Sequence, residues 1–443
     1  MENLLTWKRF SFLLLGLLTA IILWPTTKSA YEGFNLPKGP AISSLRSSEL
    51  PLDAHHDIVD TLTADQCDSA FPGLFYEVDR AAEHFRESRT SITKEDVNIT
   101  WRYGEEGQVA GAMRILIHDN QLRILETRQI IDSLGYAGRG LPLLNMLQRA
   151  VDSATAGGEK LPTIEAAIIV EDISDPPENG THSFWTFARS LTKESHQRLW
   201  LVPNFDFYVQ SEGAFEEVRR RGAARDAPFT EKIQKAIWRG QAWVNHPLRD
   251  SLLDAGKGKP WADFIDTQMD HTAWLKPDEV CKYAMNVHTE GVSYSGRLAS
   301  LSLCNSLTFV HDLEWTAHFY NLLKPDGPEQ NYVPVKRDWT DLEEKIQHYM
   351  NNPREAEKII QNSVDVLRSK ALSRAGTSCY FRKLIQGYST VSFTPEVYRP
   401  VKQGQLPRRR GLSFEAFMTM RNDLHHEDMD LLDVLEGINA GTD

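Results

Sequence analysis

The second half of the chain alternates short apolar runs with segments of helical length, and this alternation restricts its fold more than any other feature. The apolar runs predict strands at Ile233–Trp238, Tyr283–Val287, Leu307–His311 and Tyr332–Val335. The longer segments predict helices at about Arg297–Cys304, Trp315–Leu323, Asp341–Met350 and Arg354–Leu372. Strands that alternate with helices favour a parallel sheet covered by helices. The sequence therefore predicts a Rossmann-like half that begins near Thr230.

The first half carries a related pattern. Helices are expected at Asp65–Arg89 and Leu141–Ala154, and a hairpin turn at His118-Asp119-Asn120 between two apolar strands, Met113–Ile117 and Gln121–Thr127. Ala166–Val170 is expected to be a short buried strand. These elements predict a layered α/β fold, in which ligands bind outside the carboxyl ends of strands.

The N-terminus contains one long apolar run, Phe10–Trp24, directly after Lys8 and Arg9. As a helix it would be about 22 Å long, which is shorter than the roughly 30 Å hydrocarbon core of a membrane. It can be a short signal anchor, a signal peptide cut near Ala30, or a buried core helix. The anchor is favoured because residues 25–28 make a poor cleavage site. The first two alternatives place the rest of the chain in the secretory lumen.

Sequons and cysteines agree with a lumenal body. The chain has two sequons, which are Asn98-Ile99-Thr100 and Asn179-Gly180-Thr181. Its four cysteines are an even number and allow three disulfide connectivities: Cys67, Cys281, Cys304 and Cys379. Their spacing does not match a zinc site.

Length and charge exclude several classes of protein. The 443 residues and 41% hydrophobic content suit two ordinary domains with real cores. A net charge of −12 argues against a dedicated nucleic-acid binder and against a polybasic membrane-surface protein.

The segment from Lys282 to Cys304 offers the clearest candidate for ligand binding. A strand leads into a loop with Gly291, Ser293, Ser295 and Gly296, and Arg297 stands near a helix start. Backbone N–H groups at a helix start and an adjacent Arg attract phosphate oxygens. The alternative is an ordinary strand–turn–helix with a surface Arg.

Trp238-Arg239-Gly240 ends another predicted strand. Gly240 permits close approach of the backbone, so Arg239 is either a second phosphate clamp or a structural residue.

An acidic turn follows the strand Ala166–Val170. Its Glu171, Asp172 and Asp175 can supply a general base, hold a divalent cation, or form a solvated turn before Pro176-Pro177. The acidic pair Asp428 and Asp430 has no strand before it, so we assign it no metal. The sequence contains neither a Gly-x-Ser-x-Gly motif nor a Walker loop.

Taken in order, these pieces resemble the protein O-glucosyltransferase (Rumi-like) and capsule-associated glycosyltransferases. The resemblance spans about residues 65–390. It rests on Cys67-Asp68, Phe71–Phe75, Glu171-Asp172, Phe184–Phe187, Ile237–Gly240, Cys281–Tyr283, Tyr294–Arg297, Leu303-Cys304, Glu314-Trp315, Phe319-Tyr320, Lys324-Pro325 and Tyr332–Val335.

The resemblance implies a GT-B-like fold, in which two Rossmann-like lobes enclose a cleft. It implies an inverting enzyme that needs no metal and moves glucose or xylose from a UDP-sugar to a hydroxyl of a glycan or glycoprotein in the Golgi or endoplasmic reticulum. A fungal-type glycan xylosyltransferase fits as well as a protein O-glucosyltransferase. The alternatives are a catalytically silent lumenal sugar-binding or scaffold protein with the same fold, and a glycoside hydrolase.

The resemblance also assigns roles to single residues. Asp172 would be the catalytic base, with Asp175 as the fallback if the turn is shifted. Arg239 and Arg297 would neutralise the leaving diphosphate, and Glu314 would reach the ribose. The remaining donor contacts would come from Trp238, Gly240, Ser293, Ser295 and Gly296. Disulfides are implied between Cys281 and Cys304 and between Cys67 and Cys379.

The resulting division of the chain has seven parts. These are a cytosolic tail (1–9), a signal anchor (10–24), a stem (25–60), an acceptor-side lobe (61–228), a nucleotide-sugar lobe (229–370), a crossover segment back to the first lobe (371–400) and a mobile tail (401–443). Three departures from the family pattern leave the sugar and the acceptor open: Leu298-Ala299 after Arg297, the loop 326–331 without Trp or His, and Asn204 in place of Asp.

Overall fold

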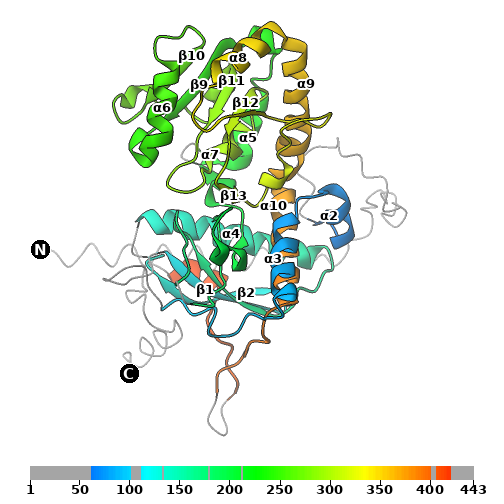
Figure 1. Cartoon of the computed structure of the whole chain (residues 1–443). Helices are drawn as coiled ribbons and strands as arrows, with labels where there is room; N and C mark the ends of the chain where they lie inside the picture. The colour runs from blue at the N-terminus through cyan, green and yellow to red at the C-terminus, as the bar shows by residue number, and fades with distance from the viewer. Residues whose placement is uncertain are drawn as a thin grey trace, which may run out of the picture. The chain divides into compact units, whose positions relative to one another are not determined.

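The computed structural model describes residues 61–100, 111–131, 134–177, 180–210, 213–400 and 406–420. These residues belong to one compact unit, 53–443, which contains two larger β-sheets (Figure 1). The expected cytosolic tail (1–9), signal anchor (10–24) and stem (25–60) all lie outside the described residues. Within the described ranges, no helix is long and apolar enough to cross a membrane.

The first sheet is mixed and has six strands. In spatial order they are β15 (Leu412–Ser413), β2 (Gln121–Arg128), β1 (Ala112–His118), β3 (Ile164–Ile169), β4 (Trp185–Thr186) and β6 (Trp200–Leu201). β1 and β2 form the predicted antiparallel hairpin. Its two turn residues, Asp119 and Asn120, have φ values of 50° and 51°. A tight hairpin turn needs positive φ at both positions, and Asp and Asn tolerate it better than other non-glycine residues.

The second sheet has five parallel strands. In spatial order they are β10 (Ala262–Asp266), β9 (Ile233–Gly240), β11 (Tyr283–His288), β12 (Leu307–His311) and β14 (Val333–Val335). Four of these strands confirm the prediction, and β10 was not predicted. Because all five run in one direction, their carboxyl ends meet at the same edge, where ligands bind in such sheets.

Helices pack on both sheets. α3 (Tyr76–Glu87), α4 (Leu134–Ala156) and α10 (Arg374–Ser389) contact strands of the first sheet. α6 (His246–Gly256), α8 (Leu342–Asn351) and α9 (Pro353–Ser363) share a hydrophobic core with the second sheet. The shorter helices are α2 (Ala64–Ala70), α5 (Phe215–Ala223), α7 (Arg297–Leu301) and α11 (Phe414–Met420), and a π-helical segment, Val364–Ala371, continues α9.

α10 lies beside α3 and α4 and completes the core of the first sheet (Figure 1). Tyr388 is fully buried, and its ring packs edge-on against Trp185 and Trp200 at centroid distances of 5.7 and 5.2 Å. Its hydroxyl donates to the Glu165 carbonyl at 3.2 Å, and the Tyr380 hydroxyl donates to the Leu201 carbonyl at 2.9 Å. Buried Tyr side chains thus contribute apolar area while their hydroxyls remain hydrogen-bonded.

Both disulfides implied by the resemblance are present. Cys67 of α2 bonds to Cys379 of α10 across 312 residues of sequence, and Cys281 bonds to Cys304 across 23. The long-range bond holds α10 against the N-terminal helices. Cross-links that close long loops restrict the unfolded chain most.

The predicted helix at Trp315–Leu323 is wrong. Trp315–Ala317 forms strand β13, which pairs antiparallel with β5 (Ala188–Ser190), and only Tyr320–Leu322 makes a 3₁₀ turn. The backbone N–H of Trp315 donates to the Glu290 carboxylate at 2.8 Å. Long-range partners therefore override a local helical pattern, as tertiary contacts often do.

Two further predictions need correction. The single helix expected at Asp65–Arg89 is two helices, α2 and α3, because the intervening turn contains Pro72 and Gly73, whose φ is 79°. The mobile tail expected from residue 401 is ordered over 406–420. There Arg410 pairs with the buried Glu165 at 2.7 Å and β15 joins β2.

Candidate active site

A pocket of about 240 Å³ lies where the carboxyl ends of β9, β10 and β11 face segments of the first half. Its lining includes Asp172, Asp206, Gly240, Thr267 and the loop Gly291–Arg297. A larger hollow of about 600 Å³ lies beside the start of β10 and is lined by Lys257, Lys259 and Asp263 among others. That hollow contains none of the predicted site residues. The smaller pocket is therefore the better candidate.

Arg297 is the first of two cations in this pocket. Within the described part of the chain its guanidinium makes no hydrogen bond, and its Nη1 is sealed from solvent. Burial lowers the pKa of Arg297 to about 10, against the opposing effect of Asp206, so the side chain is charged at neutral pH. A desolvated guanidinium without an acceptor is unfavourable, and an anionic ligand would relieve this.

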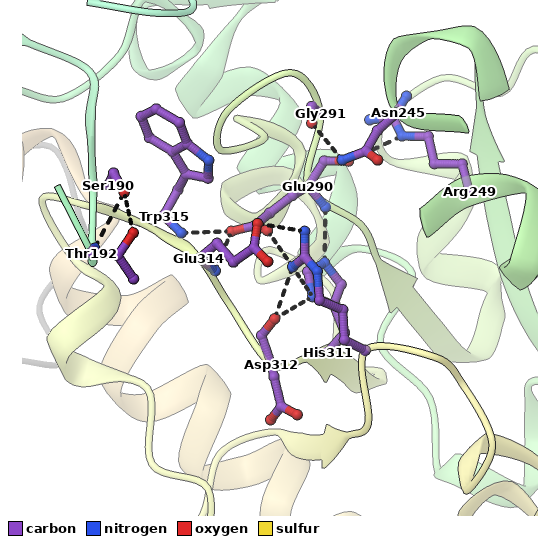
Figure 2. Close-up of polar contacts among 11 residues, drawn as sticks. Ser190, Thr192, Asn245, Arg249, Glu290, Gly291, His311, Asp312, Glu314 and Trp315 are labelled. Carbon is purple, nitrogen blue, oxygen red and sulfur yellow. Dashed lines mark hydrogen bonds and ion pairs between the residues drawn. The ribbon is translucent and has the colours of Figure 1, made fainter. Parts of the chain in front are cut away.

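Arg249, on α6, brings a second guanidinium to the pocket. Figure 2 shows this side chain beside Glu290 and Gly291. It is 4% exposed, and its Nε and Nη1 donate to the carbonyls of Glu290 and Gln241 at 3.1 and 2.7 Å. Burial, and then repulsion from Arg297, lower its pKa to about 10. Its Nη2 has no hydrogen bond to any described residue. Together the two arginines offer free donors to one anion.

The loop after β11 brings the two parts of the pocket together. The Ser293 hydroxyl donates to the Asp172 carbonyl, and the Ser295 carbonyl accepts from the Tyr320 hydroxyl at 3.3 Å. An anion in this pocket would be bound by side chains. The sequence predicted binding by backbone N–H groups at a helix start, but α7 has only five residues and is too short for this.

Gly296 is closely packed against two side chains. A Cβ at this position would lie 2.4 Å from Asn204 Nδ2 and 2.5 Å from Asp206 Oδ2. We expect Gly296→Ala to reduce the free energy of unfolding by about 1–3 kcal/mol, as overpacking does, measured by urea denaturation. The control is Gly138→Ala on α4, where a Cβ meets nothing within 4 Å. That change should add about 0.5–1 kcal/mol through helix propensity, and equal effects of both changes would contradict the packing argument.

Asp172 presents its carboxylate to the pocket. The side chain is 56% exposed and pairs with both terminal nitrogens of Arg139, Nη1–Oδ1 at 3.1 Å and Nη2–Oδ2 at 3.2 Å. Arg139 also donates to the Val170 carbonyl at 3.1 Å and lies over the Phe205 ring. The carboxylate is thus held in one orientation and remains open to an incoming hydroxyl.

Asp206 is a second pocket carboxyl. It lies on the 3₁₀ turn Phe205–Phe207, beside Gly296. Burial raises its pKa to about 6, although Arg139 and Arg297 act in the opposite direction. The pocket therefore contains two carboxyl groups in different environments, one open and ion-paired and one half-buried.

Four of the predicted site residues do not line the pocket. Asp175 pairs with Lys193 at 2.8 Å and with His196 at 2.6 Å. Burial would raise the pKa of Asp175, but the hydrogen bonds from these two residues outweigh burial and lower the pKa. Arg239 is held by Asp263 Oδ1 at 2.9 Å and by three backbone carbonyls. The buried Trp238 donates through Nε1 to Thr289 Oγ1 at 3.0 Å, and Glu314 pairs with Arg337 at 3.0 Å. The structure brings the other six together: Asp172, Gly240, Ser293, Ser295, Gly296 and Arg297.

Sequence reasoning missed Arg249, Asp206 and Arg139. Arg249 lies on α6, a helix that was not predicted, although Leu248, Leu252 and Leu253 after Pro247 give a short helical signal. No local pattern marks Arg139 or Asp206, because only the packing of distant segments brings them to the pocket.

Comparisons with known proteins cover part of the chain, including most of the residues that line the pocket. Residues 199–406 match the family model of glycosyl transferase family 90. The chain is 27% identical to protein O-glucosyltransferase 1 of Homo sapiens over 256 residues, which is 52% of this chain and 63% of that protein. It is 30% identical to O-glucosyltransferase rumi of Drosophila melanogaster over 228 residues, 46% of this chain and 54% of that protein. The match thus spans less than two thirds of these relatives. On these findings the chain is similar to Rumi-like O-glucosyltransferases and, over residues 199–406, to glycosyl transferase family 90.

Proposed function

We propose that this chain is an inverting glycosyltransferase that moves glucose or xylose from a UDP-sugar to a hydroxyl of a glycan or glycoprotein. The observation that carries the proposal is the pair of buried guanidiniums, Arg249 and Arg297, with unused donors in one pocket. A sugar nucleotide presents a diphosphate, the anion that such a pair binds well. The relatives named as O-glucosyltransferases support glucose as the first donor sugar to test.

In the proposed reaction, Asp172 removes the proton from the acceptor hydroxyl. The acceptor oxygen forms a bond to the anomeric carbon as the bond from that carbon to the phosphate oxygen breaks on the opposite face. UDP leaves with the bonding electrons, and Arg249 and Arg297 stabilise the negative charge that grows on it. The two arginines would thus stabilise the leaving diphosphate without a metal, a role that a metal cation has in other transferases.

The second clamp in this proposal is Arg249 and not Arg239. Arg239 has its donors committed to Asp263 and to backbone carbonyls, so moving it to a phosphate would break these bonds. Arg249 keeps Nη2 available without any rearrangement. Gly240 still contributes to the site by leaving room for Arg297, because a Cβ at this position would lie 3.1 Å from Arg297 Nη1.

The GT-B-like arrangement and the division into acceptor-side and nucleotide-sugar lobes are part of the proposal. A parallel sheet whose strand ends meet the pocket supports a donor lobe at about 229–370. α10, within the expected crossover segment 371–400, contacts α3 and α4 of the first half and carries the disulfide to Cys67.

We place the body of the chain in the secretory lumen, bound to the Golgi or endoplasmic reticulum membrane through 10–24. Two disulfides support an oxidising compartment. In the sequon Asn98-Ile99-Thr100, Asn98 is exposed and its Oδ1 accepts from Thr100 N and Oγ1, both at 2.7 Å.

The test is transfer and UDP release from a panel of UDP-sugars by the purified full chain, with and without EDTA. We expect turnover with UDP-glucose or UDP-xylose that EDTA does not abolish. Arg297→Ala should reduce kcat/KM about 10²-fold or more, the usual scale for a lost transition-state donor. UDP binding without turnover on any glycan or glycoprotein acceptor would favour the silent sugar-binding or scaffold protein. A folded chain that neither binds nor turns over UDP-sugars would contradict the proposal.

A further inference from the structure

Glu290 lies between the end of β11 and the pocket loop, and its side chain is almost fully buried, with 1% exposed (Figure 2). Three donors converge on its carboxylate. The backbone N–H groups of Glu314 and Trp315 donate to Oε1 at 3.0 and 2.8 Å, and Arg337 Nη1 donates to Oε2 at 2.7 Å. The carboxylate thus joins three chain segments that follow β11, β12 and β14.

The backbone of Glu290 is fixed from two further sides. Its N–H donates to His311 Nε2 at 3.0 Å, so His311 carries its proton on Nδ1, which donates to the Asp312 carbonyl at 2.8 Å. Its carbonyl accepts from Arg249 Nε at 3.1 Å. The position of the Glu290 peptide therefore decides where one side of the Arg249 guanidinium lies.

The next residue begins the pocket lining. The Gly291 carbonyl accepts from Asn245 Nδ2 at 2.8 Å, and its N–H donates to the Ser293 carbonyl at 3.0 Å (Figure 2). Any rotation of the Glu290 peptide would move both Arg249 and the start of the loop Gly291–Arg297. Ligand sites depend on such supporting contacts, because small displacements of a binding group reduce affinity.

We infer that Glu290 is a positioning residue for the donor diphosphate, acting through Arg249. The inference rests on the proposed function, since it names the group that aims one of the two phosphate clamps. Glu290 touches no substrate itself, because its carboxylate is enclosed by the three donors and the residue does not line the pocket. The anchored carboxylate fixes the peptide, and the peptide fixes the guanidinium.

The experiment measures UDP affinity by calorimetry with the purified full chain and a double-mutant cycle. Glu290→Gln leaves the side-chain shape unchanged but places an amide N–H₂ or a neutral oxygen against Arg337. We expect UDP to bind about tenfold more weakly. In an Arg249→Ala background the same change should have no effect beyond about twofold, because the residue it acts through is gone.

The matched control is Glu165→Gln. Glu165 is also fully buried and paired with an arginine, Arg410 at 2.7 Å, but it lies on β3 of the first sheet. The Glu165→Gln substitution should reduce thermal stability and leave the UDP dissociation constant unchanged. If Glu290→Gln does not fold, the same cycle is run with Arg337→Gln, which removes one of the three donors and should weaken UDP about threefold.

Three results separate the possibilities. The inference is supported if Glu290→Gln weakens UDP binding in the wild type but not in the Arg249→Ala background. An unchanged affinity, or effects of the two changes that simply add, overturns it while UDP binding by the wild type leaves the proposed function intact. Failure of the folded wild type to bind UDP overturns both.

Discussion

Replacing Asp172 with Asn is expected to reduce kcat by about 10²–10⁴-fold, the range that a positioned general base contributes. The amide keeps the size of the side chain and a hydrogen bond to Arg139, but it cannot accept the proton of the acceptor hydroxyl. UDP affinity should change little, because the phosphates are expected at Arg249 and Arg297. Initial rates at saturating donor and acceptor, together with UDP binding, measure both parts.

The comparison with Asp175→Asn identifies the base. Asp175 is already engaged by Lys193 and His196 and does not line the pocket. Its replacement should lower kcat less than tenfold, at most the low end of general-base effects. If Asp175→Asn removes turnover and Asp172→Asn does not, the assignment of the base is wrong and the acidic turn must rearrange on substrate binding.

Acidification from pH 6.5 to 5 is expected to reduce the free energy of unfolding by about 2 kcal/mol or more. Buried histidines with lowered pKa values account for the loss. Burial lowers the pKa of His288 well below its usual value, that of His311 to about 4 and that of His318 to about 3. In each case the imidazole is protonated near pH 6.5 in the unfolded chain but stays neutral in the folded chain, so stability falls as the pH drops below 6.5.

The size of the acid effect follows from adding groups of opposite sign. His311 and His318 each contribute about 1.5 kcal/mol of destabilisation over this interval, and His288 acts in the same direction. Asp206 opposes them: its folded pKa of about 6 is raised, so it gains stability of about 1 kcal/mol as the pH falls. The net loss is a large share of the 5–15 kcal/mol that usually holds a domain folded.

Urea denaturation at pH 7.5, 6.5 and 5 measures the acid effect. His318→Gln should reduce this pH dependence by about 1.5 kcal/mol, since that ring no longer titrates. A free energy of unfolding that is flat between pH 6.5 and 5, or that rises, would contradict the burial of these rings as neutral groups.

Much of the fold follows from local signals in the sequence. The alternation of apolar runs after residue 230 predicted four of the five strands in the parallel sheet, and Asp119-Asn120 predicted the hairpin. Where pairing with a distant segment decides the structure, local reasoning failed. Trp315–Ala317 has a helical pattern but forms a strand, because β5 and Glu290 satisfy its backbone.

The site shows the same division. The glycine and serine loop that ends at Arg297 was predicted because strand, turn and cation follow one another in sequence. The second cation was not predicted. Arg239 ends a predicted strand and Arg249 lies on a helix that was not predicted, and only the packing of β10 against β9 pairs Arg239 with Asp263. Arg249 is the residue that lines the pocket. Asp206 and Arg139 come from distant segments of the first half and had no local signal.

Direct binding of UDP to the full chain and to Arg297→Ala and Arg249→Ala tests the central claim, which is that two buried guanidiniums form a diphosphate site. A hydrogen bond to a charged group is worth about 1.5–3 kcal/mol, so each variant should weaken UDP by about 10- to 150-fold. Uridine, which lacks phosphates, should bind weakly to all three proteins and show no dependence on either arginine. UDP affinity that survives both replacements in folded protein would contradict the account.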